Sequence, residues 1–144
     1  MAASIAPLFE TRADLTLTLA RIVLALVFLG HGTQKMFGWF GGQVAPLGSL
    51  QGAAGVIETV CGLLVMVGLF TRPASFLASG EMAVAFWYIH VMTIAAGKNL
   101  GVPHNLIPIN NGGIDAVAFC FAFLYICSRG SGIWSLDGLM KRPR

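Results

Sequence analysis

Six polar side chains lie within or at the ends of apolar segments, and their types suit hydrogen bonding and proton transfer. The six are His31, Gln34, Lys35, Glu58, His90 and Asp115. The first three belong to GHGTQKMFGWFGG, residues 30–42, which follows the apolar run LTLTLARIVLALVFL. A simple exit from an apolar segment does not need such residues one helical turn apart. Buried histidines and carboxylates are side chains that exchange protons under mild conditions.

The composition indicates a membrane protein. Hydrophobic residues make up 56% of the 144 residues, and charged residues only 10%. A soluble domain contains about 25% charged residues, which it needs to cover its surface. The net charge of +3 is spread along the chain, so nucleic acid is not an expected partner. Cys61, Cys120 and Cys127 lie in apolar segments without a CxxC pair, which favours buried thiols over a disulfide or metal framework.

Four segments are apolar enough to be membrane spans, each of which needs about 20 residues. We expect the spans at about residues 15–37, 50–70, 74–96 and 113–128, within a single domain of residues 1–144. Because Arg21 interrupts the first segment and no small-residue cleavage site follows, it is interpreted as a span and not a cleaved signal peptide.

Helices are the default in lipid, because each span has to satisfy its own backbone polar groups. The short links favour an up-down-up-down arrangement. The expected fold is therefore all-α, an integral membrane four-helix bundle. Most basic residues fall on the side of the two termini, which places both termini in the cytoplasm.

Four of the polar candidates share one depth when each helical residue contributes a rise of about 1.5 Å. His31 and His90 lie roughly 24 Å from the inner ends of their spans, and Glu58 and Asp115 roughly 21 Å. The other two candidates lie just above. Ionisable groups in hydrocarbon usually face the bundle interior, so we expect a polar site in the outer half. A network that only stabilises the bundle remains an alternative. No HxxxH or ExxH spacing is present, and no metal is expected.

Two other sets of polar residues have expected positions. Arg21 and Glu81 both lie roughly 9–11 Å from the inner side by the same count, so we expect an ion pair between the first and third spans. The longest link, residues 97–113, is expected to fold over the outer layer as a cover. Its polar candidates are His104, Asn105, Asn110 and Asn111.

Small residues form a stripe along the second span and the residues before it. The stripe consists of Gly48, Gly52, Gly55, Thr59 and Gly62. Such a stripe lets helix backbones approach closely. Its partner is either another helix of the same bundle or a second copy of the chain in a homo-oligomer.

The segment WSLDG, residues 134–138, follows the fourth span. Ser135 or Asp137 is expected to cap a short terminal helix there, since both side chains accept hydrogen bonds from free backbone amides. Docking of a soluble partner on this segment is the alternative.

Five segments occur in the order typical of one family of small bacterial membrane proteins. They are GHGTQKMFGWFGG, GVIETVCGLLVMVGLFTRPA, EMAVAFWYIH, NNGGIDAVAFCFAFLY and GSGIWSLDG. Together they resemble the DoxX family. The resemblance reaches the candidates His31, Gln34, Lys35, Glu58 and His90, and also Glu81, Trp134 and Asp137. One difference concerns the acid that the family places directly after NGG, where this chain has Ile114 and then Asp115.

The resemblance implies a multi-pass protein of the bacterial inner membrane that is associated with redox chemistry. Relatives are described as subunits of thiosulfate:quinone oxidoreductase or are linked to quinol oxidase. We therefore expect a subunit of a quinone-linked oxidoreductase complex, with a quinone headgroup or other small polar ligand in the outer half. Quinone reduction takes up protons and needs hydrogen-bond donors at both carbonyls.

The electrons for such a reaction have to come from elsewhere. The chain has no GxGxxG, CxxC or haem-attachment motif. We therefore expect partner proteins of a redox complex in addition to membrane lipid, and not a complete enzyme. Two alternatives remain, namely a non-catalytic scaffold or assembly protein and a small-solute transporter. Four short helices leave a transporter little room for alternating access.

Overall fold

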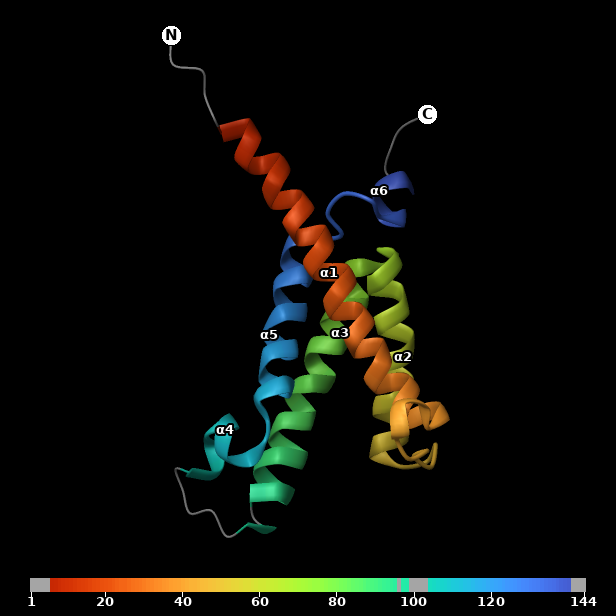
Figure 1. The fold of residues 1–144 in the computed structure, drawn as a ribbon, viewed down its shortest axis with the longest axis vertical. Coiled ribbons are helices and arrows are strands. Elements are labelled where there is room, and N and C mark those ends of the chain that lie inside the picture. Colours follow the sequence, from red (N-terminus) through yellow and green to blue (C-terminus); the bar gives the residue numbers. More distant parts are fainter. Residues whose placement is uncertain (1–5, 96, 99–103, 141–144) are drawn as a thin grey trace.

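The computed structural model describes residues 6–95, 97–98 and 104–140, and the regular elements within these ranges are helical (Figure 1). The long helices are α1 (Ala6–Phe37), α2 (Leu50–Val67), α3 (Thr71–Val84) and α5 (Ile114–Arg129). A π-helical segment, η2 (Ala85–Ala95), continues α3. The short helices are η1 (Trp39–Gly41), η3 (His104–Leu106), α4 (Pro108–Asn111) and α6 (Leu136–Met140).

The long helices form two pairs. α1 packs mainly on α2, and α3 packs mainly on α5. The pairs come together at the end of the molecule where α6 lies, here called the α6 end, and they diverge towards the opposite end, where α4 lies (Figure 1). α1 begins at the α6 end, so the first and last helices lie at the same end of the molecule.

Among the residues that the structure describes, three helical segments are long and apolar enough to cross a membrane. They are Asp14–Phe37, Leu50–Val67 and Thr71–Ile94, the last of which combines α3 with most of η2. The expectation of an all-α protein with several spans is confirmed. α5 lies beside α3 but has only 16 residues, fewer than a typical span of about 20.

The helix boundaries differ from the expected ones between the second and third spans. α2 ends at Val67 because Gly68 adopts a left-handed conformation with φ of 71°, and its amide donates to the carbonyl of Leu64. α3 begins at Thr71, three residues before the expected start. Pro73 is tolerated there because amides in the first turn have no acceptor within the helix.

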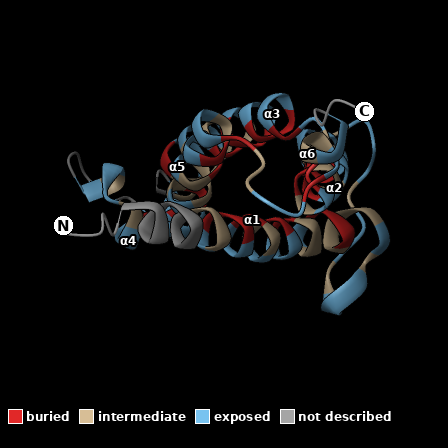
Figure 2. Cartoon of the chain, turned by 90° about the horizontal axis from the view of Figure 1, so that it is seen from above, coloured by how far each residue is buried: buried red, intermediate tan, exposed pale blue. Residues whose placement is uncertain are grey.

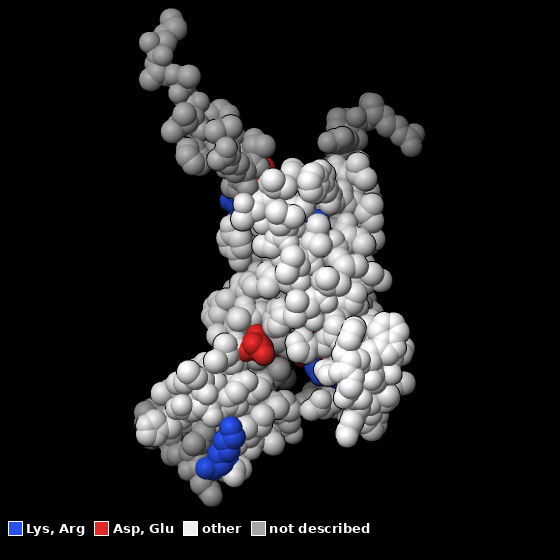
Figure 3. Space-filling model, in the orientation of Figure 1, with Lys and Arg blue, Asp and Glu red and all other residues white. Residues whose placement is uncertain are grey.

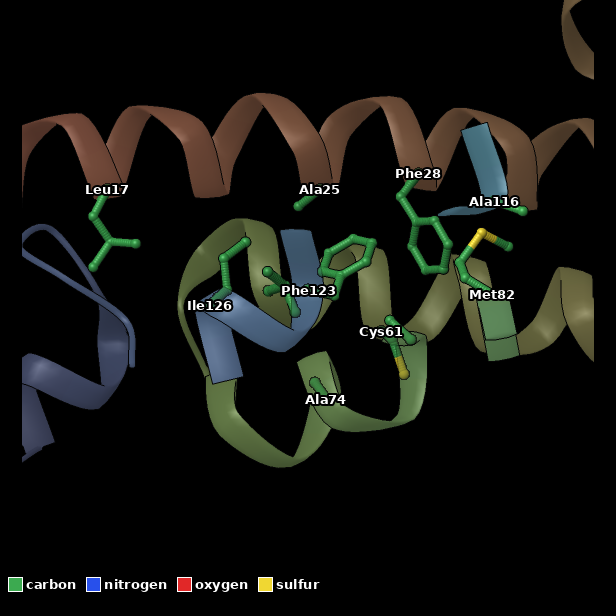
Figure 4. Close-up of a cluster of buried hydrophobic side chains, with 11 residues drawn as sticks. Leu17, Ala25, Phe28, Cys61, Ala74, Met82, Ala116, Phe123 and Ile126 are labelled. Carbon is green, nitrogen blue, oxygen red and sulfur yellow. The ribbon is translucent and has the colours of Figure 1, made fainter. Parts of the chain in front are cut away.

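The hydrophobic core lies where the four long helices meet (Figure 4). Phe28 of α1 and Phe123 of α5 are fully buried, with ring centroids 4.7 Å apart in an edge-to-face arrangement. Small residues such as Ala25, Ala74 and Ala78 let the helices approach these rings. Cys61 is buried within this core, and all three cysteines are free thiols. Buried residues line the inner faces of the helices and exposed residues their outer faces (Figure 2).

The expected ion pair between Arg21 and Glu81 is wrong. Arg21 is fully buried and donates to the carbonyls of Val65 (2.5 Å), Met66 (2.7 Å) and Trp134 (3.1 Å). The last carbonyls of a helix lack partners within the helix, so the guanidinium caps α2 and attaches the segment before α6. Since α3 begins early, Glu81 lies roughly 15 Å from its start and not near the inner side.

Candidate functional site

Glycines bring α1 and α2 close together and thereby set the geometry of the site. A β-carbon on Gly32 would lie 2.5 Å from the amide nitrogen of Thr59, and one on Gly62 would lie 3.0 Å from the α-carbon of Leu29. Gly52 and Gly55 are also buried, against residues 46–47 and 35–36. Most of the glycine stripe therefore packs against residues of the same chain. Gly48 alone has open space beside it.

The close contact places Lys35 of α1 over Glu58 of α2. Lys35 Nζ donates to Glu58 Oε1 at 2.5 Å, which is the one ion pair between side chains in the part of the chain that the structure describes. The Glu58 side chain is 2% exposed, and its second oxygen, Oε2, is buried with no hydrogen-bond partner in the part of the chain that is described. Lys35 is 26% exposed, so its ammonium group remains accessible from one side.

A cavity of about 690 Å³ lies on the accessible side of this ion pair, between α2 and the helix formed by α3 and η2. Its polar lining consists of His31, Lys35, Gln51, Glu81, His90 and Asp115. The apolar lining includes Ile57, Phe76, Leu77, Met82, Ile89 and Phe119. The surface view shows a hollow between the two helix pairs, with charged side chains at its margin (Figure 3). The cavity thus combines an apolar wall with a small number of polar groups.

The structure brings most of the six candidates together. His31, Lys35, His90 and Asp115 line the cavity, and Glu58 lies behind Lys35. Gln34 does not line it, because its side chain lies against Gly42 in the turn that follows α1.

Two cavity residues were not assigned to the site from the sequence. Glu81 lines the cavity, and its oxygen Oε2 is buried without a hydrogen-bond partner among the described residues. Gln51 lies in the first turn of α2, at the edge of the span, where a polar residue is unremarkable from sequence. A helix start at Thr71 would have placed Glu81 at the correct depth, but the pattern TRP indicates a loop.

His90 is held by the link that follows η2. Its Nδ1 forms a hydrogen bond of 3.2 Å with the carbonyl oxygen of Asn111. Asn111 is fully buried, where its amide group donates to the carbonyl of Asn105 (2.9 Å) and accepts from the backbone of Gly113 (2.8 Å). The cavity wall at His90 is therefore supported by an ordered turn.

The expected cover over the outer layer has a different position. Asn110 donates to the carbonyl of His104, so these residues hold the link together. α4 and η3 pack on η2, on the side of the molecule away from α2 (Figures 1 and 2). Within the described part of residues 97–113, only Gly112 lines the cavity.

The π-helical segment is a local feature that α-helical counting does not foresee. A π-helix has wider turns than an α-helix and often marks a functional site. Here it carries Trp87, Tyr88 and His90, and the Thr93 hydroxyl donates to the carbonyl of Tyr88, five residues earlier. The wider turns change which residues of this segment face the cavity.

The chemistry of the cavity is hydrogen bonding and proton exchange beside an apolar surface. Lys35 provides N–H donors, and the carboxylates of Glu81 and Asp115 provide acceptors. Within the described residues, no three His, Cys, Asp or Glu side chains form a group that could hold a metal ion.

Comparison with known proteins identifies a family and several relatives of this chain. The sequence model of the DoxX family matches residues 16–91. An uncharacterized protein of Haemophilus influenzae is 40% identical over 125 residues, which cover 84% of this chain and 87% of the relative. The inner membrane protein YphA of Escherichia coli is 30% identical over 141 residues, or 90% and 93% of the two chains. An uncharacterized membrane protein of Mycobacterium tuberculosis is 28% identical over 133 residues, or 85% and 79%. No solved structure matches the chain.

Proposed function

Since the chain belongs to the DoxX family and is a multi-pass protein of the bacterial inner membrane, we propose that its cavity binds a quinone headgroup as part of a membrane oxidoreductase complex. The proposal depends on one observation, namely that five ionisable side chains from four helical elements line a single, mostly apolar cavity. These side chains are His31, Lys35, Glu81, His90 and Asp115.

The size and lining of the cavity suit a quinone. A quinone is a flat ring with an oxygen at each end and a hydrocarbon tail. Pockets for small molecules measure about 300–1,000 Å³ and are mostly apolar with a few polar groups, and this cavity of about 690 Å³ falls in that range. Its apolar wall supports the ring, and its charged and imidazole groups serve the two oxygens.

The surroundings of the cavity favour a ligand that arrives through the bilayer. Leu50 of α2 and Phe76, Leu77 and Val84 of α3 line the cavity, yet their side chains are about half exposed or more. In a membrane, these exposed apolar side chains contact lipid. A hydrocarbon tail leaving the cavity between α2 and α3 would therefore remain in an apolar environment.

The roles of individual residues follow from their chemistry. Lys35 donates to a ring oxygen, while Glu58 keeps the ammonium in place. Glu81 and Asp115 receive or supply protons as the ring changes its redox state. The chain carries no sequence motif for a redox centre of its own, so a partner protein supplies or removes the electrons.

The proposal includes a membrane arrangement. α5 is the fourth span and completes a four-helix bundle with α1, α2 and α3. Its 16 residues suffice if the membrane is thinner around it or if flanking residues reach the interface. α3 begins and α5 ends at the α6 end (Figure 1), and Arg72 and Arg129 belong to these helix ends. We therefore place both termini in the cytoplasm and the cavity in the outer half of the membrane.

A pair of matched glycine variants tests the proposal. Gly80 lines the cavity and Gly30 does not, and both have open space where a β-carbon would be added. We expect quinone to be extracted from the purified wild-type protein and from Gly30→Phe, and to be largely lost from Gly80→Phe. Quinone would be measured by redox difference absorbance of a solvent extract. Equal quinone in both variants, or none in the wild type, would contradict the proposal and favour a scaffold.

A further inference from the structure

The hydrogen bond between His90 and Asn111 determines which nitrogen of the imidazole carries a proton. Its acceptor is a backbone carbonyl oxygen, which has lone pairs and no hydrogen. Nδ1 of His90 is therefore the donor. A neutral imidazole has a single N–H group, so Nε2 then carries a lone pair and is a hydrogen-bond acceptor.

The position of the Asn111 carbonyl is fixed by the turn around it. The Asn111 side chain is fully buried and joins the backbone of Asn105 to that of Gly113. The turn ends at Gly112, whose φ of 77° favours glycine over other residues. The acceptor for Nδ1 is thus preformed and does not depend on a bound ligand.

Nε2 of His90 is the ring nitrogen that remains available. It has no hydrogen-bond partner among residues 6–95, 97–98 and 104–140, and it is not among the polar atoms that are sealed from solvent. His90 lines the cavity, and Nε2 lies on the side of the ring away from the Asn111 bond. A ligand that reaches Nε2 from the cavity would therefore meet a hydrogen-bond acceptor.

The other helix pair, α1 and α2, offers hydrogen-bond donors to the cavity. Lys35 Nζ has three N–H groups, of which one donates to Glu58. The remaining two are available where Lys35 lines the cavity. The cavity therefore has a donor on α1 and an acceptor on η2, and a complementary ligand needs a donor towards η2.

We propose that the cavity selects the hydroquinone form of its ligand over the quinone form, with one ring hydroxyl donating to His90 Nε2 and the other oxygen accepting from Lys35. Both oxygens of a quinone only accept, so a quinone would set a carbonyl against the lone pair of Nε2. Asn111 is a positioning residue that acts through His90. This inference depends on the proposed function and extends it by naming the redox state that is bound.

Two substitutions of His90 separate its two nitrogens. In His90→Asn, the short amide replaces Nδ1 and keeps a donor for the Asn111 carbonyl, but nothing replaces Nε2. In His90→Gln, the longer amide replaces Nε2, and its oxygen remains an acceptor while the bond to Asn111 is lost. His104→Asn is the matched control, because His104 is exposed and does not line the cavity.

The measurement is the affinity of the purified protein for a short-chain quinone and for its hydroquinone, by calorimetry under anaerobic conditions. We expect the wild type and His104→Asn to bind the hydroquinone several-fold more tightly. His90→Asn should lose this preference, and His90→Gln should retain part of it. A purely structural His90 would leave the preference intact in His90→Asn, and that result would overturn the inference.

Other results distinguish the inference from the proposed function. If the wild type binds both forms with equal affinity, the cavity is a quinone site but the inference is wrong. If the wild type binds neither form, the proposed function and the selectivity both fail. ¹⁵N NMR of histidine-labelled protein gives an independent readout, since a proton on Nε2 of neutral His90 would also overturn the inference.

Discussion

Lys35 of α1 and Glu58 of α2 form a hydrogen-bonded ion pair, with 2.5 Å between Lys35 Nζ and Glu58 Oε1. The ion pair connects the packing of α1 on α2 to the lining of the cavity. Glu58 is buried at the contact between the helices, whereas Lys35 also lines the cavity. A change in the spacing of α1 and α2 therefore changes the position of the Lys35 ammonium group in the cavity.

The ion pair predicts a strong coupling between Lys35 and Glu58. Lys35→Met leaves the buried Glu58 carboxylate without its donor, and removing one partner of a buried pair costs about 3–5 kcal/mol. Because Lys35 is 26% exposed, water will reduce this loss. The double variant Lys35→Met with Glu58→Gln should lose less than the sum of the single variants, with a coupling of about 0.5–3 kcal/mol.

The coupling would be measured as the free energy of unfolding in mixed detergent micelles. A pair that merely coexists at the surface would give additive effects, and additivity would show that the two side chains do not depend on each other.

Two neighbouring glycines in α1 predict opposite effects of the same substitution. Gly32→Ala places a β-carbon 2.5 Å from the backbone of Thr59, which cannot move without separating α1 from α2. We expect a loss of about 1–3 kcal/mol of stability from overpacking. Gly30→Ala meets nothing within 4 Å, so the better helix propensity of alanine should stabilise by up to about 1 kcal/mol.

The melting temperature of each purified variant provides the measurement. Similar melting temperatures for the two variants would mean that α1 and α2 do not approach as closely at Gly32 as the structure shows.

The helices could be predicted from the sequence because long apolar segments between loops have few alternatives in lipid. Their ends were harder to predict. Pro73 indicates a loop, yet it lies in the first turn of α3, where its missing amide proton has no consequence. The early start of α3 moves Glu81 by about a turn, which was enough to assign it the wrong partner, Arg21.

The site was predicted in part because depth along a helix follows from simple counting. Counting placed His31, His90 and Asp115 in one layer, and all three line the cavity. Counting gives depth but not direction, so it could not show that Gln34 lies beside Gly42 or that Glu58 lies behind Lys35. The π-helical turns around His90 have no recognised sequence signal, and they change the directions in which the side chains of this segment point.

Arg21 is predicted to be essential for the attachment of the segment before α6. Its guanidinium reaches carbonyls of both α2 and Trp134, a geometry that the single ammonium of lysine cannot reproduce. We expect Arg21→Lys to lose about 1–3 kcal/mol, as buried carbonyls lose their donors. Hydrogen exchange of the amides in residues 130–138 should become faster, while exchange in the α4 turn stays unchanged. Uniformly faster exchange would instead indicate global destabilisation.

Asp137 is predicted to act as the N-terminal cap of α3 although it lies far away in the sequence. Its two carboxylate oxygens accept from the amides of Phe70 and Thr71, each at 2.9 Å. Phe70 itself has a left-handed φ of 47°. Loss of a helix cap costs about 0.5–2 kcal/mol, and the charge of the carboxylate adds a favourable interaction with the helix dipole. We expect Asp137→Asn to lose part of this stabilisation and Asp137→Ala all of it.

The graded series of Asp137 variants would be followed by thermal unfolding and by limited proteolysis at residues 68–72. Ser135→Ala is the matched comparison, since the Ser135 hydroxyl caps α6 itself through the amide of Gly138, and its other hydrogen bonds go to Ser131 and Gly132. If Asp137→Ala and Ser135→Ala weaken only α6, then the carboxylate is a local cap, and α3 begins without its help. If Asp137→Ala alone exposes residues 68–72 to protease, the segment after α5 holds the junction between α2 and α3 in place, and so the angle at which the two helix pairs diverge around the cavity.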